Sequence, residues 1–502
     1  MKKLILAAVV MAAGCASDEA SPGKPVVQEV GGDHPEKLKY ATLEFKVPDP
    51  ATFRTVLPNG MIVYAIEDHS LPLVDLRLQA RGGSFWQPKG KEGLASACGT
   101  LMRIGGTTTR DPAEIDQAID ILAAQLSVGI ADVTAQAVLS VLSKDVDQGL
   151  ALFFDILRNP GFKQDKIDFF KAQMMRGMRA RNDATPGIEG REAGLLLYGD
   201  YPSNAHPTKA SVESLSRDDL IAFHKEIFYP GNFIISAAGD FDRAQFLKKL
   251  EAACDGWANP ANPPKREIPK VTHTPKPGVY AIHKEGKQIN QGRVTMGHLG
   301  IDISSPDVHA IRIMAYILGA GGFSSRLMQR VRTEEGLVYD VGCDYRPGIA
   351  YTGTFRMVFQ SKSESCLYAA KLCMEELGKI RDKEVTAEEL NDAVNFYLDG
   401  FPGLFFATKF QTTNTFANAE INGYPANYFQ TWREKVRAVT AKDVQRVAKE
   451  HCHPDKLIYV FTGNMTDVRK GDGKHEIRME DFGQITDVPL PDPMTLERKK
   501  GE

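Results

Sequence analysis

An internal repeat constrains the fold of this 502-residue chain more than any other feature of its sequence. A helix start, a turn and a strand each occur twice, and the second copy always begins 224 residues after the first. The matched segments are 216–220 with 440–444, 229–230 with 453–454, and 233–239 with 457–463. One offset shared by three kinds of element predicts duplication of a domain of about that size.

A proline-rich segment separates the two copies. Prolines stand at positions 260, 263, 264, 269, 275 and 277. Because proline lacks a backbone N–H and cannot sit in a helix interior or a central strand, we expect residues 255–278 to form a linker. A long surface loop within one domain is the alternative, which the repeat on either side disfavours. The predicted domains are therefore residues 45–254 and 279–465, followed by a polar tail, 466–502, to which we assign no function.

Local patterns in the first copy alternate between strands and helices. Asn59-Gly60 between apolar stretches predicts a β-hairpin. Asp111 as N-cap, with Pro112 and Glu114 after it, predicts a helix start. Further strands are predicted over 74–81 and 133–142, and further helices over 92–104 and 146–157. The predicted fold class is α+β, not a doubly wound parallel sheet.

The charge balance disfavours nucleic acid as a partner. The chain has 61 basic and 64 acidic residues, a net charge of -3, and no long run of one sign. Its hydrophobic content of 43% and charged content of 25% are typical of a globular protein.

The first residues have the order of a secretory signal. Met1-Lys2-Lys3 precedes an apolar run, 4–13, and then Gly14-Cys15. The end of this run resembles a bacterial lipobox, although Ala12 stands where Leu is usual. We expect residues 1–15 to be a lipoprotein signal with lipidated Cys15, and 16–44 to be a polar tether. Because Ala16 rather than Asp follows Cys15, the expected location is the outer membrane, facing the periplasm. A signal peptide without lipid is the alternative.

The other six cysteines do not predict a structural metal site. None of them forms a Cys-x-x-Cys pair or has zinc-finger spacing. Their disulfide state stays open at this point.

Several glycine-containing segments resemble the insulinase/pitrilysin family of zinc peptidases. Gly82-Gly83-Ser84, Gly93-Leu94-Ala95 and Gly106-Thr107 are similar to the N-terminal domain of that family. Residues 319–326, 331–339 and 439–440 are similar to its C-terminal domain, and the resemblance covers roughly residues 45 to 465. It implies two homologous α/β-sandwich-like domains, each a mostly antiparallel sheet with packed helices, in a clamshell arrangement.

The zinc motif of that family is missing here. In the family, the helix after Gly-Leu-Ala carries His-x-x-Glu-His, which places two imidazoles on one helix face to bind zinc and a carboxylate beside them to deprotonate water. The same positions in this chain are Ser96, Gly99 and Thr100. A further Glu ligand would fall near Gly177, but residues 164–188 contain no Glu. The resemblance therefore implies that this chain binds no zinc itself.

A second pair of family residues is present. Arg332 and Tyr339 match an Arg and a Tyr that hold the substrate backbone and stabilise the oxyanion. Gly336 between them predicts a helix C-terminus. Local sequence alone favours a structural role, with Arg332 in a surface ion pair and Tyr339 half buried. The resemblance favours the functional role.

The resemblance also implies a partner. Some family members are heterodimers in which one subunit carries the zinc motif and the other carries the Arg and the Tyr. This chain looks like the second kind, so we expect zinc on a homologous partner subunit and peptides as substrates. Pairing with a second copy of itself stays possible.

Two alternatives to this function differ in class. One is a catalytically inactive peptide-binding or scaffold protein of the cell envelope. The other, weaker alternative is an active peptidase with an unusual metal site. His451 and His453 are poor candidates for such a site, because residues two apart point to different sides of a helix and no His-x-x-Glu companion lies near them in the sequence. His206 before Pro207 is interpreted as a surface turn residue.

Overall fold

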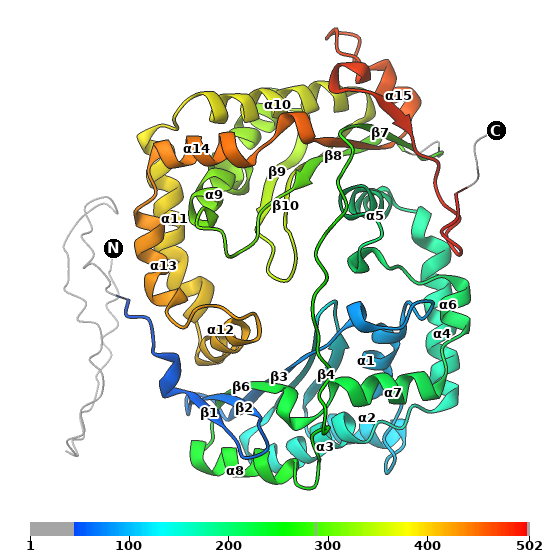
Figure 1. Ribbon diagram of the computed structural model, residues 1–502, viewed down its shortest axis with the longest axis vertical. Coiled ribbons are helices and arrows are strands. Elements are labelled where there is room, and N and C mark those ends of the chain that lie inside the picture. The colour runs from blue at the N-terminus through cyan, green and yellow to red at the C-terminus, as the bar shows by residue number, and fades with distance from the viewer. Residues whose placement is uncertain (1–44, 287–288, 499–502) are drawn as a thin grey trace, which may run out of the picture. The chain divides into compact units, whose positions relative to one another are not determined.

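The computed structural model describes residues 45–286 and 289–498. The chain forms a short unit, Met1–Lys46, and a large one, Val47–Glu502, which holds every described helix and strand. The large unit contains two six-stranded sheets with helices packed on them (Figure 1). No helix in the described ranges is both long and apolar enough to cross a bilayer. Cys15 and the predicted signal lie outside the described residues.

The first sheet has the strand order β1-β2-β6-β3-β5-β4. Only β2 and β6 are parallel neighbours; the other neighbours are antiparallel. The hairpin predicted at Asn59-Gly60 joins β1 to β2, and Gly60 has a φ of 88°, which glycine adopts without strain. The strands are β1 (Arg54–Val56), β2 (Ile62–Glu67), β3 (Leu73–Arg81), β4 (Gln125–Ile130), β5 (Thr134–Leu142) and β6 (Phe233–Gly239).

Helices from the first half share one hydrophobic core with this sheet. The capping box predicted at Asp111 and Glu114 begins the second of them. The helices are α1 (Leu94–Ile104), α2 (Pro112–Ile121), α3 (Val146–Arg158), α4 (Gln164–Arg179), α7 (Arg217–Ile227) and α8 (Arg243–Ala253). Two further helices of this half are α5 (Thr185–Tyr198) and α6 (Lys209–Glu213).

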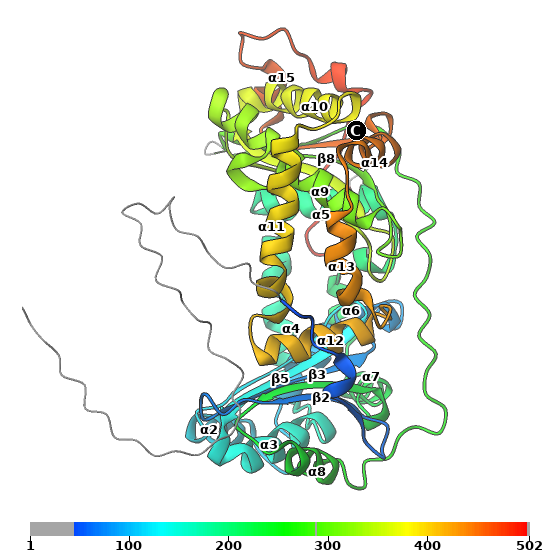
Figure 2. The same cartoon turned by 90° about the vertical axis from the view of Figure 1, so that its left-hand side faces the viewer.

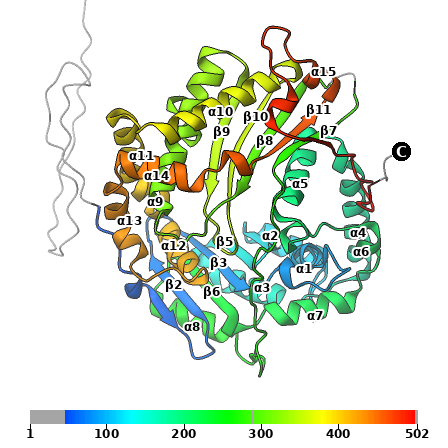
Figure 3. The ribbon, with the colours of Figure 1, turned by 45° about the horizontal axis from the view of Figure 1, so that its top comes forward.

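The second sheet has the order β12-β7-β11-β8-β10-β9. β7 is parallel to both β11 and β12, and the other neighbours are antiparallel. The strands are β7 (Gly278–His283), β8 (Gln291–Leu299), β9 (Val338–Arg346), β10 (Thr354–Lys362), β11 (Ile458–Gly463) and β12 (Ile485–Asp487). The helices of this half are α9 (Val308–Ala315), α10 (Cys366–Asp382), α11 (Ala387–Phe406), α12 (Lys409–Ile421), α13 (Tyr428–Arg437), α14 (Ala441–His451) and α15 (Met465–Lys470). Figure 3 shows α10 and α14 lying across the strands.

The two halves are structural copies, as the repeat predicts. β6 and β11 occupy the same position in their sheets, and α7 and α14 precede them. Ser216 and Thr440 cap these helices in the same way, since each hydroxyl accepts a hydrogen bond from the amide of the aspartate three residues later. The α+β class and the duplicated domain are thus confirmed.

Each sheet is covered on one face by a helix of the other half, which the sequence did not predict. α12 lies on β2, β3 and β6 of the first sheet, and α5 lies on β8 and β11 of the second (Figure 1). Strand alternation separates the two faces: Ser236 points to α12, whereas Ile235 and Ala237 lie in the core on the other side. In β11, Ile458 packs with α5.

Polar contacts hold α12 on the first sheet. Glu420 accepts hydrogen bonds from Arg54 at 2.7 and 3.0 Å and from the hydroxyl of Tyr64 at 2.5 Å. Gln79 donates to Asn418 at 2.8 Å. Burial alone would raise the pKa of Glu420, but the hydrogen bonds from Arg54 and Tyr64 outweigh it and lower that pKa. The ionised carboxylate therefore stabilises the contact between the halves.

We expect Glu420→Gln to lower the free energy of unfolding by about 1–2 kcal/mol at pH 7, at the low end because Arg54 is 36% exposed and solvent screens the pair. A lowered folded-state pKa stabilises above the unfolded value of about 4.3, and this contribution is lost as the pH falls through the folded value. Urea unfolding at pH 7 and pH 3 measures both effects. Tyr64→Phe, which keeps the ion pair, is the matched control and should change stability less. A difference between wild type and Glu420→Gln that is as large at pH 3 would contradict the assignment.

The segment predicted as a polar tail carries structure over its described part. It adds α15 and β12 to the second half. Further on, Asn182 donates a hydrogen bond to the carbonyl oxygen of Pro491 at 2.8 Å, and the amide of Lys209 donates one to the carbonyl oxygen of Met494 at 2.8 Å. Arg498 forms an ion pair with the buried Glu192. These contacts fasten the segment to α5 and its neighbours in the first half.

The predicted linker has no regular secondary structure over most of its length. Residues 257–277 contain no helix or strand and run along one side of the large unit (Figure 2).

The six cysteines of the described ranges are free and buried, and burial raises the pKa of Cys254, Cys366 and Cys452 to about 12.

Candidate functional site

Glycines shape the segment that carries Arg332 and Tyr339. At Gly319, in the π-helical turn η8 (Tyr316–Ala320), an added Cβ would lie 2.3 Å from the amide nitrogen of Cys343 in β9. Only glycine allows this close approach. Arg332 follows in a second π-helical segment, η10 (Met328–Glu334), and Gly336 ends it with a φ of 65°. Tyr339 then enters β9, so the helix end predicted between the two residues is present.

Arg332 and Tyr339 lie together at the surface. The guanidinium carbon of Arg332 is 4.9 Å from the centre of the Tyr339 ring and 4.4 Å from that of Phe323. Tyr339 is 84% exposed and Phe323 is 64% exposed. A guanidinium that stacks on aromatic rings keeps its in-plane N–H groups free for hydrogen bonds. The arrangement therefore presents a cationic donor to solvent.

Neighbouring arginines are neutralised, but Arg332 is not. Arg326 forms a bidentate pair with Glu389 at 2.6 and 2.9 Å. Arg330 pairs with both Glu334 and Glu335. Within the described ranges, Arg332 has no ion pair and no hydrogen bond from its guanidinium. The structural alternative, with Arg332 in a surface ion pair and Tyr339 half buried, is therefore wrong.

Sequence analysis did not single out Phe323. It lies in η9 (Gly322–Ser324), directly after the Gly321-Gly322 pair. Its ring makes no ring–ring contact with another described aromatic residue. A large apolar side chain at the end of a glycine pair is the signal that could have indicated an exposed contact residue.

The positions of the lost zinc motif do not fit a metal ion. Ser96 is exposed on α1, Thr100 is partly buried, and Gly99 is buried against β4. A Cβ at Gly99 would lie 2.9 Å from the amide nitrogen of Ile130 and 3.1 Å from Cα of Gly129. Two hydroxyl side chains and a bare backbone packed against a strand provide no imidazole and no carboxylate.

The position of the further Glu ligand also lacks a side chain that could bind a metal ion. Gly177 is exposed near the end of α4, and an added Cβ there would meet open space. The α4 side chain that reaches the start of α1 is Met174, whose sulfur would lie 3.2 Å from a Cβ at Gly93. A thioether is a soft ligand and cannot replace a carboxylate at a zinc site.

The remaining histidines do not supply a substitute site. Asp307, Glu450 and His451 form a group with ligand atoms within 4.8 Å of one another in the part of the chain described. Arg446 already binds this group, donating to Asp307 at 2.7 Å and to Glu450 at 2.8 Å. The hydrogen bonds from Arg446, ahead of that from His451, hold the pKa of Asp307 below its usual value despite partial burial. This cluster is an ion-pair network.

His206 and His453 stand apart from that group. His206 is half-buried rather than a surface turn residue, and its burial, followed by the charges of Arg181 and Arg191, lowers its pKa. The amide of His453 donates to the ring of His298 at 3.0 Å. Neither belongs to a group of metal-ligand side chains among the residues that the structure describes.

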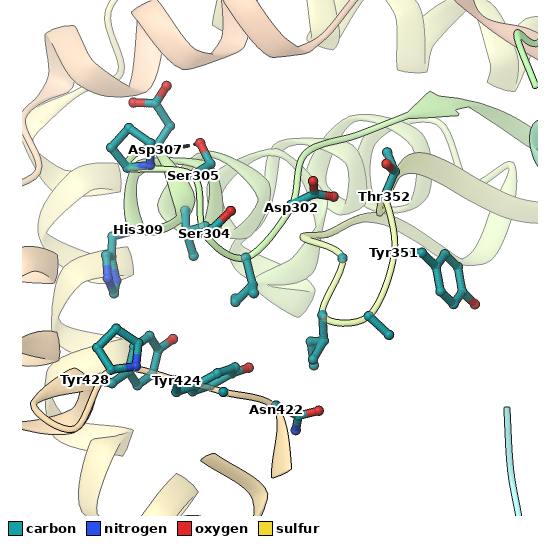
Figure 4. A pocket seen from close by; sticks show the side chains of 18 of the residues that line it. Asp302, Ser304, Ser305, Asp307, His309, Tyr351, Thr352, Asn422, Tyr424 and Tyr428 are labelled. Carbon is teal, nitrogen blue, oxygen red and sulfur yellow. Dashed lines mark hydrogen bonds between the residues drawn. The ribbon is translucent and has the colours of Figure 1, made fainter. Parts of the chain in front are cut away.

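A cavity of about 1120 Å³ opens beside the linker (Figure 4). The aromatic residues Tyr351, Tyr424 and Tyr428 line it together with polar residues such as Asp302 and Ser304. Neither member of the Arg332–Tyr339 pair is among its lining residues. It is therefore a separate feature from the Arg332–Tyr339 pair.

Comparisons with known proteins agree with the fold. Residues 214–397 match the family model described as the peptidase M16 inactive domain. The crystal structure of a peptidase M16 inactive domain from Pseudomonas fluorescens has a TM-score of 0.73 and 25% identity, covering 82% of this chain and 97% of that one.

Two curated relatives are similar to this chain over most of its length, and their names differ. A Helicobacter pylori protein named non-peptidase homolog YmxG is 25% identical over 402 residues, 79% of this chain and 90% of that protein. A Streptomyces coelicolor protein named as an uncharacterized zinc protease is 22% identical over 400 residues, 79% of this chain and 86% of that protein.

Proposed function

Because the chain belongs to the insulinase/pitrilysin family of zinc peptidases, peptidase M16, we propose that it is the non-catalytic subunit of a heterodimeric metallopeptidase. Zinc is carried by a homologous partner subunit in this proposal. The chain contributes Arg332 and Tyr339 to the degradation or processing of peptides.

One observation carries the proposal. Arg332 lies partly buried at the surface, stacks on aromatic rings and lacks an anionic partner among the described residues, while Arg326 and Arg330 on the same segment are paired with carboxylates. The match to an inactive domain, and the serine, glycine and threonine at the motif positions, support assigning the metal to another chain.

The chemistry follows from the two side chains. The guanidinium of Arg332 offers several N–H donors in one plane, and the phenol of Tyr339 offers one O–H donor. Both can donate to a peptide carbonyl oxygen as it gains negative charge, which lowers the barrier of the step that forms the charge. Before that step, the same donors hold the peptide backbone in place.

Reconstitution tests the proposal. The second protein of the assay, here called the companion, is to be a homologue from the same genome that carries an intact His-x-x-Glu-His motif. The chain alone, the companion alone and their equimolar mixture are assayed on a fluorogenic peptide, with zinc quantified in each. We expect one zinc per heterodimer and hydrolysis mainly in the mixture. A mixture no faster than the companion alone would instead favour a peptide-binding or scaffold protein, and one zinc bound by this chain alone would favour the active-peptidase alternative.

We also propose a location. The sequence of residues 1–16 supports an outer-membrane lipoprotein that faces the periplasm, held by a lipid on Cys15. The mass of the mature N-terminus decides between this and a signal peptide cleaved without lipidation.

A further inference from the structure

The contact between Phe323 and Arg332 is closer than that between Arg332 and Tyr339. The guanidinium carbon lies 4.4 Å from the Phe323 ring, well within the range of about 6 Å in which a cation is attracted by an aromatic face. Phe323 and Tyr339 do not stack on each other in the described part of the chain. Arg332 therefore contacts the two rings separately.

The loop that carries Phe323 is held by its own hydrogen bonds. Gly322 has a φ of 62°, and its carbonyl accepts a hydrogen bond from the hydroxyl of Ser325 at 2.7 Å. Ser325 is 1% exposed, so this bond anchors the loop in the interior. The bidentate pair of Arg326 with Glu389 ties the next residue to α11. The position of the ring is thus part of the fold.

Burial does not explain the ring. Phe323 is 64% exposed, and leaving most of a phenylalanine in water forgoes the stabilisation that its burial would bring. Its ring contact is a charged side chain that has no ion pair with any described residue. A long arginine side chain at a surface otherwise samples many rotamers, and ordering it has an entropic cost. A fixed aromatic surface reduces that cost before the substrate arrives.

We propose that Phe323 is a positioning residue that, together with Tyr339, orients Arg332 so that its N–H edge faces the peptide oxygen it binds. The inference rests on the proposed function and adds a third residue to it. Phe323 acts through Arg332 and donates no hydrogen bond itself. Its removal should therefore weaken the action of Arg332 without abolishing it.

A double-mutant cycle on the reconstituted complex tests this. Phe323→Leu keeps an apolar side chain but removes the aromatic face, and we expect a loss of about 3- to 10-fold in kcat/KM for the fluorogenic peptide. Phe323→Tyr keeps the face and should restore most of the activity. In the Arg332→Ala background, Phe323→Leu should have no further effect. Phe169→Leu, at another exposed phenylalanine 54% accessible to solvent, is the matched control.

A second measurement uses the isolated chain. The Nε–Hε resonance of Arg332 in NMR spectra reports the ring contacts without any partner. We expect it to move in Phe323→Leu and to stay in place in Phe169→Leu. An unmoved resonance, or an equal loss of activity with and without Arg332, would overturn the role of Phe323. Full activity of Arg332→Ala would instead defeat the proposed function, and the resonance would still show whether Phe323 orients Arg332.

Discussion

Replacing Arg332 by alanine should lower kcat/KM of the reconstituted complex by about 100-fold, the usual effect of removing one preorganised donor to a developing oxyanion. The side chain is partly buried, has no ion pair in the described structure and stacks on the two exposed rings, so the free energy of unfolding should change by about 1 kcal/mol or less. Association with the companion should also persist. Steady-state kinetics, thermal unfolding and sedimentation measure the three quantities on the same preparation.

Two further variants separate charge from geometry at this site. Arg332→Lys keeps the positive charge but loses the planar set of donors, so its activity should lie between those of wild type and Arg332→Ala. Arg330→Ala removes a neighbouring arginine whose charge Glu334 and Glu335 already neutralise, and it should remain close to wild type. Equal losses in Arg330→Ala and Arg332→Ala would indicate a general effect of surface charge and would contradict the assignment.

The parts of the fold that sequence predicts well depend on short-range rules. The repeat is visible because a capping hydroxyl, a turn proline and a strand-ending glycine recur at one spacing, and each acts on the backbone nearby. The end of the helix at Gly336 is predictable for the same reason, since a φ of 65° at that position requires no distant contact. The chain changes direction at this helix end, which brings Tyr339 at the start of β9 next to Arg332.

The exchange of α5 and α12 depends on contacts between residues far apart in the chain. Each helix buries polar as well as apolar residues, so apolar periodicity alone does not indicate which of its faces packs on a sheet. The signal lies in the strands, where Ser236 and Thr295 are fully buried at positions that an isolated core would fill with apolar residues. Their partners are Asn414 on α12 and Glu189 on α5, which only the folded structure identifies.

The interpretation of Arg332 as an ion-paired surface residue fails for a related reason. Glu334 and Glu335 follow it closely, so the sequence provides two apparent partners. Both carboxylates bind Arg330, because the π-helical turn brings that side chain alongside them. Which of two nearby arginines a carboxylate selects depends on local helix geometry, and sequence spacing does not report it.

Rebuilding the family's zinc motif should fail because of the backbone. Gly99→Glu, alone or combined with Ser96→His and Thr100→His, should lower the free energy of unfolding by about 3–5 kcal/mol. Its Cβ would lie 2.9 Å from the amide nitrogen of Ile130 and 3.1 Å from Cα of Gly129. These are main-chain atoms of β4, so the strand itself must move to admit the side chain. The carboxylate would also lose its hydration, because position 99 is buried.

Matched variants isolate this cause. Ser96→His, at an exposed position of α1, should change stability by less than about 0.5 kcal/mol. Gly99→Ala, which adds the Cβ alone, should cost about 1–3 kcal/mol. Urea unfolding gives the energies, and zinc quantification after dialysis should find less than one ion per chain in the triple variant. A triple variant with wild-type stability and one tightly bound zinc would mean that three side chains alone separate this chain from a metal-binding member. Failure of that variant places the difference in how closely α1 packs on β4.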